Sequence, residues 1–216
     1  MQRKFFDVFA SAIGLVMVVA LVVAGSLLMW GYSFANSNVH NQLAAQDITF
    51  PTAAEFAHAK PGTEITPQML PYLLQYAGQP LTTGAQAEAY ANHFIAYHLA
   101  EMPYNGVYAT VSAESRANPT NAKLAAEVNT VFTGTTLRGL LLEAYAFSVI
   151  ATIAYWAGIA AFVLAGIMLV LVAFGFWHAR RTREDEELHV RNDHLVVKSE
   201  GQDGNGHVKD VEAVTV

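Results

Sequence analysis

The histidine and acidic side chains between residues 84 and 102 are of the types that bind metal ions or transfer protons. His93 and His98 are five residues apart on a predicted helix, which separates them by roughly 140° around its axis. Two metal ligands from one helix are better placed three or four residues apart, so His98 and Glu101 form the one well-spaced pair. Two ligands do not make a metal site. We therefore expect His98 to be a packed or interfacial histidine.

Other patterns that would indicate catalysis are missing from the sequence. It contains no Gly-rich phosphate loop, no HExxH and no GxSxG. Glu55, Glu64, Glu88 and Glu101 could pair as acid and base, but scattered glutamates usually form a solvated face. With no cysteine, the chain has no disulfide, no lipobox anchor, no thiolate metal site and no cysteine nucleophile. The sequence predicts a protein that is not an enzyme and carries no cofactor.

Two long segments without Asp, Glu, Lys or Arg dominate the chain, at residues 8–46 and 144–179. Each is longer than the roughly 20 apolar residues that cross a bilayer. Aromatic residues, which settle at membrane interfaces, lie 21 residues apart in each segment, an interval of about 31 Å that matches the hydrocarbon thickness. They are Phe9 and Trp30 in the first segment, and Trp156 and Trp177 in the second. We predict transmembrane helices over residues 8–32 and 150–178.

Basic residues close to the spans indicate the orientation, because they resist translocation across the membrane. Arg3 and Lys4 precede the first span, and Arg180, Arg181 and Arg183 follow the second. The region between the spans has only Lys60, Arg116, Lys123 and Arg138 against eight acidic residues. We therefore predict a multi-pass protein of the bacterial inner (plasma) membrane, with both termini in the cytoplasm and the central domain outside.

A cleaved signal peptide is the competing interpretation of the first span, with Ser33-Phe34-Ala35 as the cleavage site. The apolar run is about 24 residues, whereas a signal core has about 7 to 15. We therefore expect a retained anchor.

The region between the spans divides into an extended half and a helical half. Residues 33–83 contain five prolines and predict a short strand at Asp47–Phe50 and a helix or turn at Pro67–Tyr76. From Thr83, which can cap a helix, apolar residues recur at helical spacing to about Met102.

The following segment predicts two more helices. Asn118 before Pro119 is a good helix start, and the apolar face of that helix would be Leu124, Val128, Val131 and Phe132. Gly134 is expected to interrupt it. A second helix then begins at residue 135 or 136 and continues to Arg180, about 65 Å in length.

This last helix is about twice as long as the hydrocarbon is thick. Its first turns must therefore stand outside the membrane as a stalk from residue 136. Its apolar side chains need burial against the external helices or against another protein. The candidate interaction residues are Leu137, Leu140, Leu141, Tyr145 and Phe147, with Trp156 of the aromatic belt.

The composition of the spans argues against transport or channel activity, because proton relays and ion pathways require charged groups inside the membrane. Small residues four apart would allow close helix approach, although an alanine-rich lipid-facing surface explains them equally well. The pairs are Ala10 with Gly14, Ala20 with Ala24, Ala154 with Gly158 and Ala161 with Ala165.

The sequence as a whole predicts a mainly α protein in which two transmembrane helices flank a mostly helical extracytoplasmic domain. The segments are a cytoplasmic N-terminus (1–7), the first span (8–32), the extracytoplasmic domain (33–149), the second span (150–178) and a flexible acidic cytoplasmic tail (179–216). The net charge of −6 is spread over the central domain and tail, so nothing points to nucleic acid.

Three runs carry a resemblance to a known family. They are residues 132–142 (FTGTTLRGLLL), residues 48–51 (ITFP) after the first span, and residues 108–112 (YATVS) between helices. Over residues 40–160 the chain resembles a family of two-span actinobacterial envelope proteins. Some proteins of similar layout are accessory subunits of the respiratory supercomplex of complexes III and IV. The resemblance implies that role here, with oxidase or cytochrome subunits as partners.

Three functions are compatible with the sequence. The first is a non-catalytic accessory or assembly subunit that contacts other integral membrane subunits through the stalk. The second is an envelope sensor or ligand-binding receptor with a pocket in the external domain, for which deletion of the tail should abolish signalling. The third is an extracytoplasmic enzyme, which requires His98, Glu101 and another acidic or histidine side chain to converge. We favour the first.

Overall fold

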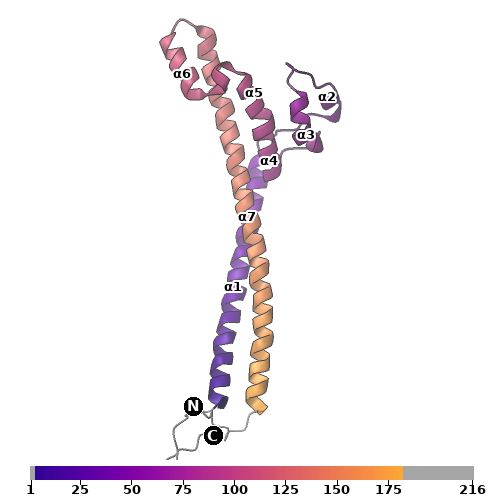
Figure 1. Cartoon of the computed structure of the whole chain (residues 1–216), viewed down its shortest axis with the longest axis vertical. Coiled ribbons are helices and arrows are strands. Elements are labelled where there is room, and N and C mark those ends of the chain that lie inside the picture. Colours follow the sequence, from indigo (N-terminus) through magenta and orange to yellow (C-terminus); the bar gives the residue numbers. More distant parts are fainter. Residues whose placement is uncertain (1–2, 182–216) are drawn as a thin grey trace, which may run out of the picture.

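The structure, a computed structural model, describes residues 3–181. Within that range the fold is mainly α-helical, with two long apolar helices, α1 (Arg3–Ala44) and α7 (Ala122–Arg181), flanking shorter helices. Figure 1 shows α1 and α7 side by side through the lower part of the molecule, with the shorter helices around the upper part of α7. The predicted acidic tail (179–216) lies outside the described residues from position 182 onward.

The head, defined here as residues 45–121, consists of short helices joined by turns. Its α-helices are α2 (Ala53–Ala57), α3 (Leu70–Leu73), α4 (Gly84–Tyr90), α5 (Ala96–Glu101) and α6 (Tyr108–Ala117). Three 3₁₀ turns are η1 (Pro67–Met69), η2 (Leu74–Tyr76) and η4 (Pro103–Gly106), and the π-helical segment η3 (Ala91–Ile95) joins α4 to α5. Figure 1 places α2 and α3 on one side of α7, and α6 on the other.

α1 packs against α7 through a seam of buried and half-buried residues. On α1 these residues recur at alternating spacings of four and three, the heptad pattern that keeps one helix face toward its partner. They are Asp7, Ser11, Gly14, Val18, Leu21, Gly25, Leu28 and Tyr32. Tyr32 contacts Tyr155 with ring centroids 5.0 Å apart, and Asp7 Oδ2 lies 3.9 Å from His178 Nε2. These contacts at the two ends of the seam make the helices antiparallel.

Small residues allow the two backbones to come close along this seam. A Cβ atom added at Gly158 would lie 3.3 Å from the carbonyl oxygen of Gly25, and one at Gly175 would lie 2.3 Å from Ser11 Oγ. The small residues predicted to permit close approach divide between buried and exposed positions. Gly14, Gly158, Ala161 and Ala165 are buried on the seam, Ala154 is half-buried, and Ala10, Ala20 and Ala24 are exposed.

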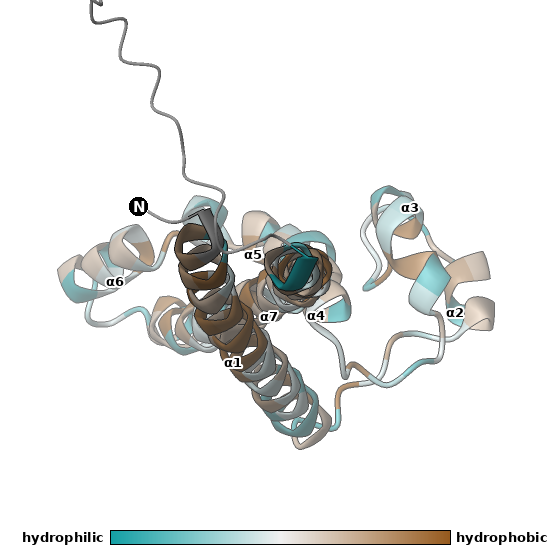
Figure 2. Cartoon of the chain, turned by 90° about the horizontal axis from the view of Figure 1, so that it is seen from below, coloured by the Kyte–Doolittle hydropathy of each residue, from teal (hydrophilic) through white to brown (hydrophobic). Residues whose placement is uncertain are grey.

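The outward surface of the paired helices is apolar, whereas the head is mixed. Figure 2 shows much of α1 in the hydrophobic colour, hydrophobic turns of α7 behind its hydrophilic lower end, and the head in alternating hydrophilic and hydrophobic shades. Both helices are long and apolar enough to cross a membrane, and most of their apolar side chains face outward. A soluble core helix would instead bury these side chains.

The head has two apolar clusters, and both include residues of α7. The larger cluster contains Phe50, Phe56, Met69, Leu73 and Ile95 of the head, with Leu43 of α1 and Leu141 of α7. The smaller cluster joins α6 to α7 through Val111, Leu124 and Val131. α7 is therefore the support against which the head folds.

α7 runs without interruption for 60 residues, about 90 Å, so the predicted break at Gly134 is wrong. The helix begins at Ala122 and not at residue 135 or 136. A Cβ atom at Gly134 would lie 3.0 Å from Leu99 Cδ2. The glycine makes room for this side chain of α5, and the packing holds the helix together across it.

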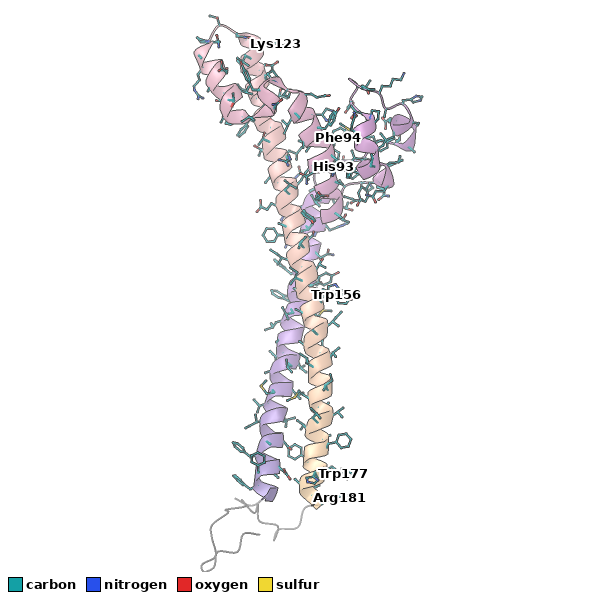
Figure 3. The ribbon with its side chains drawn as sticks, in the orientation of Figure 1. His93, Phe94, Lys123, Trp156, Trp177 and Arg181 are labelled. Atoms are coloured by element: carbon teal, nitrogen blue, oxygen red, sulfur yellow. The ribbon has the colours of Figure 1, made fainter. Side chains whose placement is uncertain are left out.

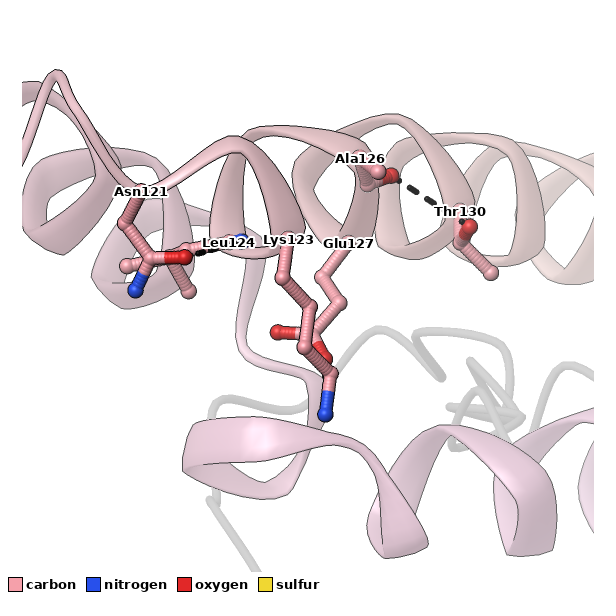
Figure 4. Close-up of polar contacts among 6 residues, drawn as sticks. All are labelled: Asn121, Lys123, Leu124, Ala126, Glu127 and Thr130. Carbon is pink, nitrogen blue, oxygen red and sulfur yellow. Dashed lines mark hydrogen bonds and ion pairs between the residues drawn. The ribbon is translucent and has the colours of Figure 1, made fainter.

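Asn121, rather than Asn118, caps the start of α7. The backbone N–H of Leu124 donates to Asn121 Oδ1 at 3.0 Å (Figure 4). Asn118 ends α6, since its own backbone N–H donates to the carbonyl oxygen of Glu114 at 3.0 Å. The prediction that Asn118 and Pro119 start the helix is thus wrong by about one turn.

Three further expectations are corrected. Residues 3–181 contain no β-strand, because Thr49 forms only an isolated antiparallel bridge with Pro80, which has no N–H to extend a ladder. Residues 108–112, expected between helices, form the first turn of α6. Residues 33–44, expected in the extended half, continue α1.

Other local predictions are confirmed. Thr83 caps α4, accepting from the backbone N–H of Gln86, whose side chain accepts in return from the backbone N–H of Thr83. Helical structure then continues to Glu101, and residues 67–76 form helical turns as expected.

Candidate interaction surface

The two histidines of the α4–α5 region are packed against aromatic rings. His93 stacks on Tyr72 with ring centroids 3.5 Å apart, and the His98 ring contacts Phe94. His98 Nδ1 lies 2.8 Å from the carbonyl oxygen of Phe94; because a carbonyl can only accept, Nδ1 donates. His98 is half-buried, which agrees with the expectation of a packed or interfacial histidine. Among residues 3–181 no three His, Cys, Asp or Glu side chains gather closely enough to hold a metal ion.

A polar chain ties the head to α7. Arg138 Nη2 donates to Asn92 Oδ1 at 2.9 Å, and Asn92 Nδ2 donates to Glu88 Oε1 at 2.9 Å. Asn92 belongs to η3, the π-helical segment. All three bonded groups are partly buried, so the arginine positions the head on the long helix and is not free to meet a partner.

Two head residues have shifted pKa values. Burial raises the pKa of the Tyr90 phenol, and the negative charge of Glu64 raises it further. Hydrogen bonds from the backbone N–H and hydroxyl of Thr52 lower the pKa of the exposed Glu55. Both shifts follow from folding, namely the aromatic core around Tyr90 and the capping box of α2.

A hollow in the described part of the chain lies on α7, outside the head. It has a volume of about 300 Å³, is shallow and apolar, and is lined by Val170, Ala173, Phe174 and Trp177 of α7. Trp177 also stacks under Arg181, whose guanidinium carbon lies 4.2 Å from the ring centroid (Figure 3). This surface belongs to the outer face of the helix pair.

The six candidate interaction residues lie in different surroundings on α7. Leu141 is only 2% exposed and belongs to the head core, and Leu137 packs against the same core. Tyr145 is next to α4, since its Cα lies 3.3 Å from the position of a Cβ on Gly84. Trp156 is exposed beside Tyr155. Leu140 and Phe147 are exposed.

Leu140 and Phe147 belong to a longer apolar stripe on the face of α7 opposite Arg138 and Leu141, two residues that contact the head. At 100° per residue, four apolar side chains fall within about 80° of one another on this face. They are Phe132, Leu140, Phe147 and Ile150, which are 52%, 58%, 50% and 60% exposed. We call these four residues the outer stripe. Glu143, which is exposed, lies on the same face between Leu140 and Phe147.

The outer stripe extends onto the tip of the head. The rings of Tyr108, at the start of α6, and Phe132 lie 5.5 Å apart, and Tyr108 is itself exposed. Phe132 lies 24 residues before Trp156, about 36 Å along the helix. The apolar surface of α7 thus continues well beyond the aromatic position of Trp156.

Phe132 and Ile150 were not among the interaction residues predicted from the sequence. Phe132 was expected to pack with Leu124, Val128 and Val131. Those three belong to the smaller apolar cluster with Val111 of α6, whereas Phe132 is half exposed and contacts Tyr108 at the start of α6. The assumed break at Gly134 concealed the pattern, because Phe132 then belonged to a different helix from Leu140. On one continuous helix the apolar positions 132, 140, 147 and 150 fall on one face.

Searches with this chain find no matching family model, curated protein or solved structure.

Proposed function

We propose that this chain is a non-catalytic accessory or assembly subunit of a larger bacterial membrane complex. It is held in the bilayer by α1 and the lower part of α7. The observation that carries the proposal is the outer stripe, an exposed apolar face on the upper, head-bearing part of α7. Lipid covers an apolar surface only inside the membrane. Outside it, monomeric soluble proteins seldom expose a large apolar patch, so such a patch indicates a binding partner.

The packing of the helix pair supports two spans. Because Tyr32 faces Tyr155 and Asp7 approaches His178, the aromatic residues of both helices fall at two common levels. Those levels are about 31 Å apart along the helices, close to the hydrocarbon thickness. We therefore place the upper boundary of the hydrocarbon at Trp156, six residues after the predicted start of the span at residue 150. The upper level holds Trp30 and Trp156, and the lower level holds Phe9 and Trp177.

The proposed topology has the head outside and both termini inside. The clustering of basic residues near the lower ends of the helices supports it, with Arg180 and Arg181 closing α7. In that orientation the head and the outer stripe lie outside the cytoplasm. The stripe would therefore be accessible to the extracytoplasmic parts of other membrane subunits.

The position of the hollow on α7 supports a structural role over a receptor. A receptor needs a concave apolar site with converging polar groups, whereas the hollow described above lies on the outer face of α7 near Trp177. The family resemblance makes the respiratory supercomplex of complexes III and IV the first candidate assembly.

Affinity purification from the native membrane in mild detergent tests this proposal. We expect other integral membrane proteins in fixed stoichiometry with the tagged chain, and oxidase or cytochrome subunits if the respiratory assignment is right. The control is the same purification after the membranes are dissolved in a denaturing detergent, which should release the partners. Recovery of the chain by itself, with a native mass of one or two copies, would contradict the proposal.

A further inference from the structure

The spacing of residues on the outer face of α7 defines a second helix-packing seam. The exposed apolar residues Leu140, Phe147 and Ile150 fall on positions at alternating spacings of four and three, as the seam residues of α1 do. Thr136 and Glu143 occupy the other two positions of this run. Heptad spacing of this kind fits a second helix that crosses at about 20°. α7 therefore has two seams, one covered by α1 and the head, and one exposed.

The lower end of the outer stripe indicates that its partner is a membrane protein. Phe147 and Ile150 lie nine and six residues before Trp156, so they are about 13 Å and 9 Å above the upper aromatic level. Between them and Trp156 lies Ile153, which is also exposed. A helix covering the stripe would thus continue directly from a span of its own, next to this one.

Glu143 indicates the charge of that partner. It is exposed in the middle of the outer stripe, and among residues 3–181 no ion pair or hydrogen bond of its side chain is found. Arg138, the nearest basic residue in sequence, instead donates to Asn92 on the other face of α7. A helix packed over Leu140 and Phe147 would draw the carboxylate out of water, so a cation is needed opposite it.

The same carboxylate disfavours a second copy of this chain as the occupant. Two copies in one membrane share their orientation, and a two-fold axis between parallel α7 helices would place each residue of the seam at the level of its own counterpart. Glu143 would then face Glu143, and like charges across a helix pair are destabilising.

Building on the proposed function, we propose that the outer stripe binds the outward extension of a transmembrane helix of another integral membrane protein, and that a lysine or arginine of that helix pairs with Glu143. The stripe supplies the apolar contact area. The ion pair sets the level at which the two helices engage, because a shift of one helical turn would leave both charges without a partner.

Site-specific photo-crosslinking in native membranes tests the position. A photoreactive residue at Leu140 should crosslink to a peptide that flanks a transmembrane segment and contains a lysine or arginine. The same residue at Glu101, which is exposed on α5, is the control and should not give that product. A crosslink to a second copy, or to a protein without a span, would overturn the inference.

Charge reversal tests the ion pair. Glu143→Lys should reduce the recovery of the crosslinked partner at least about tenfold, since like charges across an interface cost several kcal/mol, and the opposite reversal in the partner should restore it. Glu101→Lys should have no effect. If partners co-purify in full with Glu143→Lys and Leu140 gives no crosslink, this inference fails while the accessory role stands. If no partner co-purifies with the unaltered chain, the accessory role itself fails.

Discussion

Arg138 and Glu143 show how two charges on one helix acquire different roles. The sequence places them five residues apart, where they cannot pair with each other. Arg138 faces the head and is held by Asn92, which lies 46 positions earlier in the chain. Glu143 faces away and is exposed. The first charge therefore helps to fix the fold, and the second lies on the outer face, where we expect a partner.

Adding one methyl group at Gly84 should weaken the packing of α4 on α7 and so destabilise the head. A Cβ atom there would lie 2.4 Å from Ser148 Cβ and 3.3 Å from Tyr145 Cα, so α4 would have to move away from α7. We expect Gly84→Ala to cost about 1–3 kcal/mol of local stability. Hydrogen exchange of residues 84–101 in the purified chain should then be roughly 5- to 150-fold faster.

Gly139→Ala is the matched control for this change. A Cβ atom at Gly139 would have no neighbour within 4 Å, and alanine favours a helix interior by about 0.5–1 kcal/mol. This variant should exchange no faster than the unaltered chain. Equal exchange in both variants would contradict the close packing of α4 on α7.

Tyr90 should make the head sensitive to alkali. Its pKa is raised by burial and by Glu64, so the folded head favours the protonated phenol. The contribution of the protonated phenol to the stability of the head is complete below the ordinary tyrosine pKa of about 10. It is lost as the pH rises through the higher pKa that Tyr90 has in the folded head. Circular dichroism should show helix loss above about pH 10, and Tyr90→Phe should shift that loss to higher pH.

Tyr104→Phe provides the comparison, because Tyr104 is an exposed residue of η4. It should leave the alkaline transition where it is. If Tyr104→Phe shifted the alkaline loss of helix and Tyr90→Phe did not, the assignment of that loss to Tyr90 would be wrong.

At the scale of elements, the antiparallel register of α1 and α7 determines which surface of each helix remains outside. Gly25 faces Gly158, Gly14 faces Val172, and Ser11 faces Gly175. From the sequence, the seam was visible only as pairs of small residues on each helix. Those pairs could not show which surface is packed, because each is compatible with both a lipid-facing and a packed surface. The register itself depends on contacts between residues more than 100 positions apart.

An engineered disulfide can test this register, and the absence of native cysteine makes the result unambiguous. The Cβ of Ser11 lies 3.5 Å from the position of a Cβ at Gly175, within the range for a disulfide. We expect Ser11→Cys with Gly175→Cys to form an intramolecular disulfide on mild oxidation of isolated membranes. Gel mobility with and without reductant would detect it.

The control pair combines Ser11→Cys with Leu171→Cys, since Leu171 is exposed on the outer face of α7. It should remain reduced under the same conditions. Oxidation of the control pair at the same rate would mean that the register is different or that the helices slide.

At the scale of the whole molecule, one helix connects the proposed cytoplasmic end to the tip of the head. α7 pairs with α1 below, supports the head core through Leu141, and carries α6 near its start through Val131. Because all these contacts involve a single continuous helix, a displacement of the head relative to the bilayer requires bending α7. We expect the molecule to act as a fixed spacer.

Cysteine labelling tests the proposed topology of the whole chain. Lys123 lies at the start of α7, and its side chain is 88% exposed. A membrane-impermeant maleimide should label Lys123→Cys in intact cells. Ser199→Cys, in the predicted cytoplasmic tail, should be labelled only after the membrane is permeabilised. The reverse pattern would place the head in the cytoplasm and refute the orientation.

Features that depend on neighbours along the chain could be predicted from the sequence. These include the two long apolar helices, the cap at Thr83 and the helical turns of residues 67–76, since hydropathy, capping residues and prolines act over a few positions. Two further features became clear from the three-dimensional structure: Gly134 lies inside a helix, and Phe132 and Leu140 share an exposed face. Those outcomes depend on which surface of α7 is covered by Leu99, α1 and the head, and burial is set by contacts between residues that are distant in sequence.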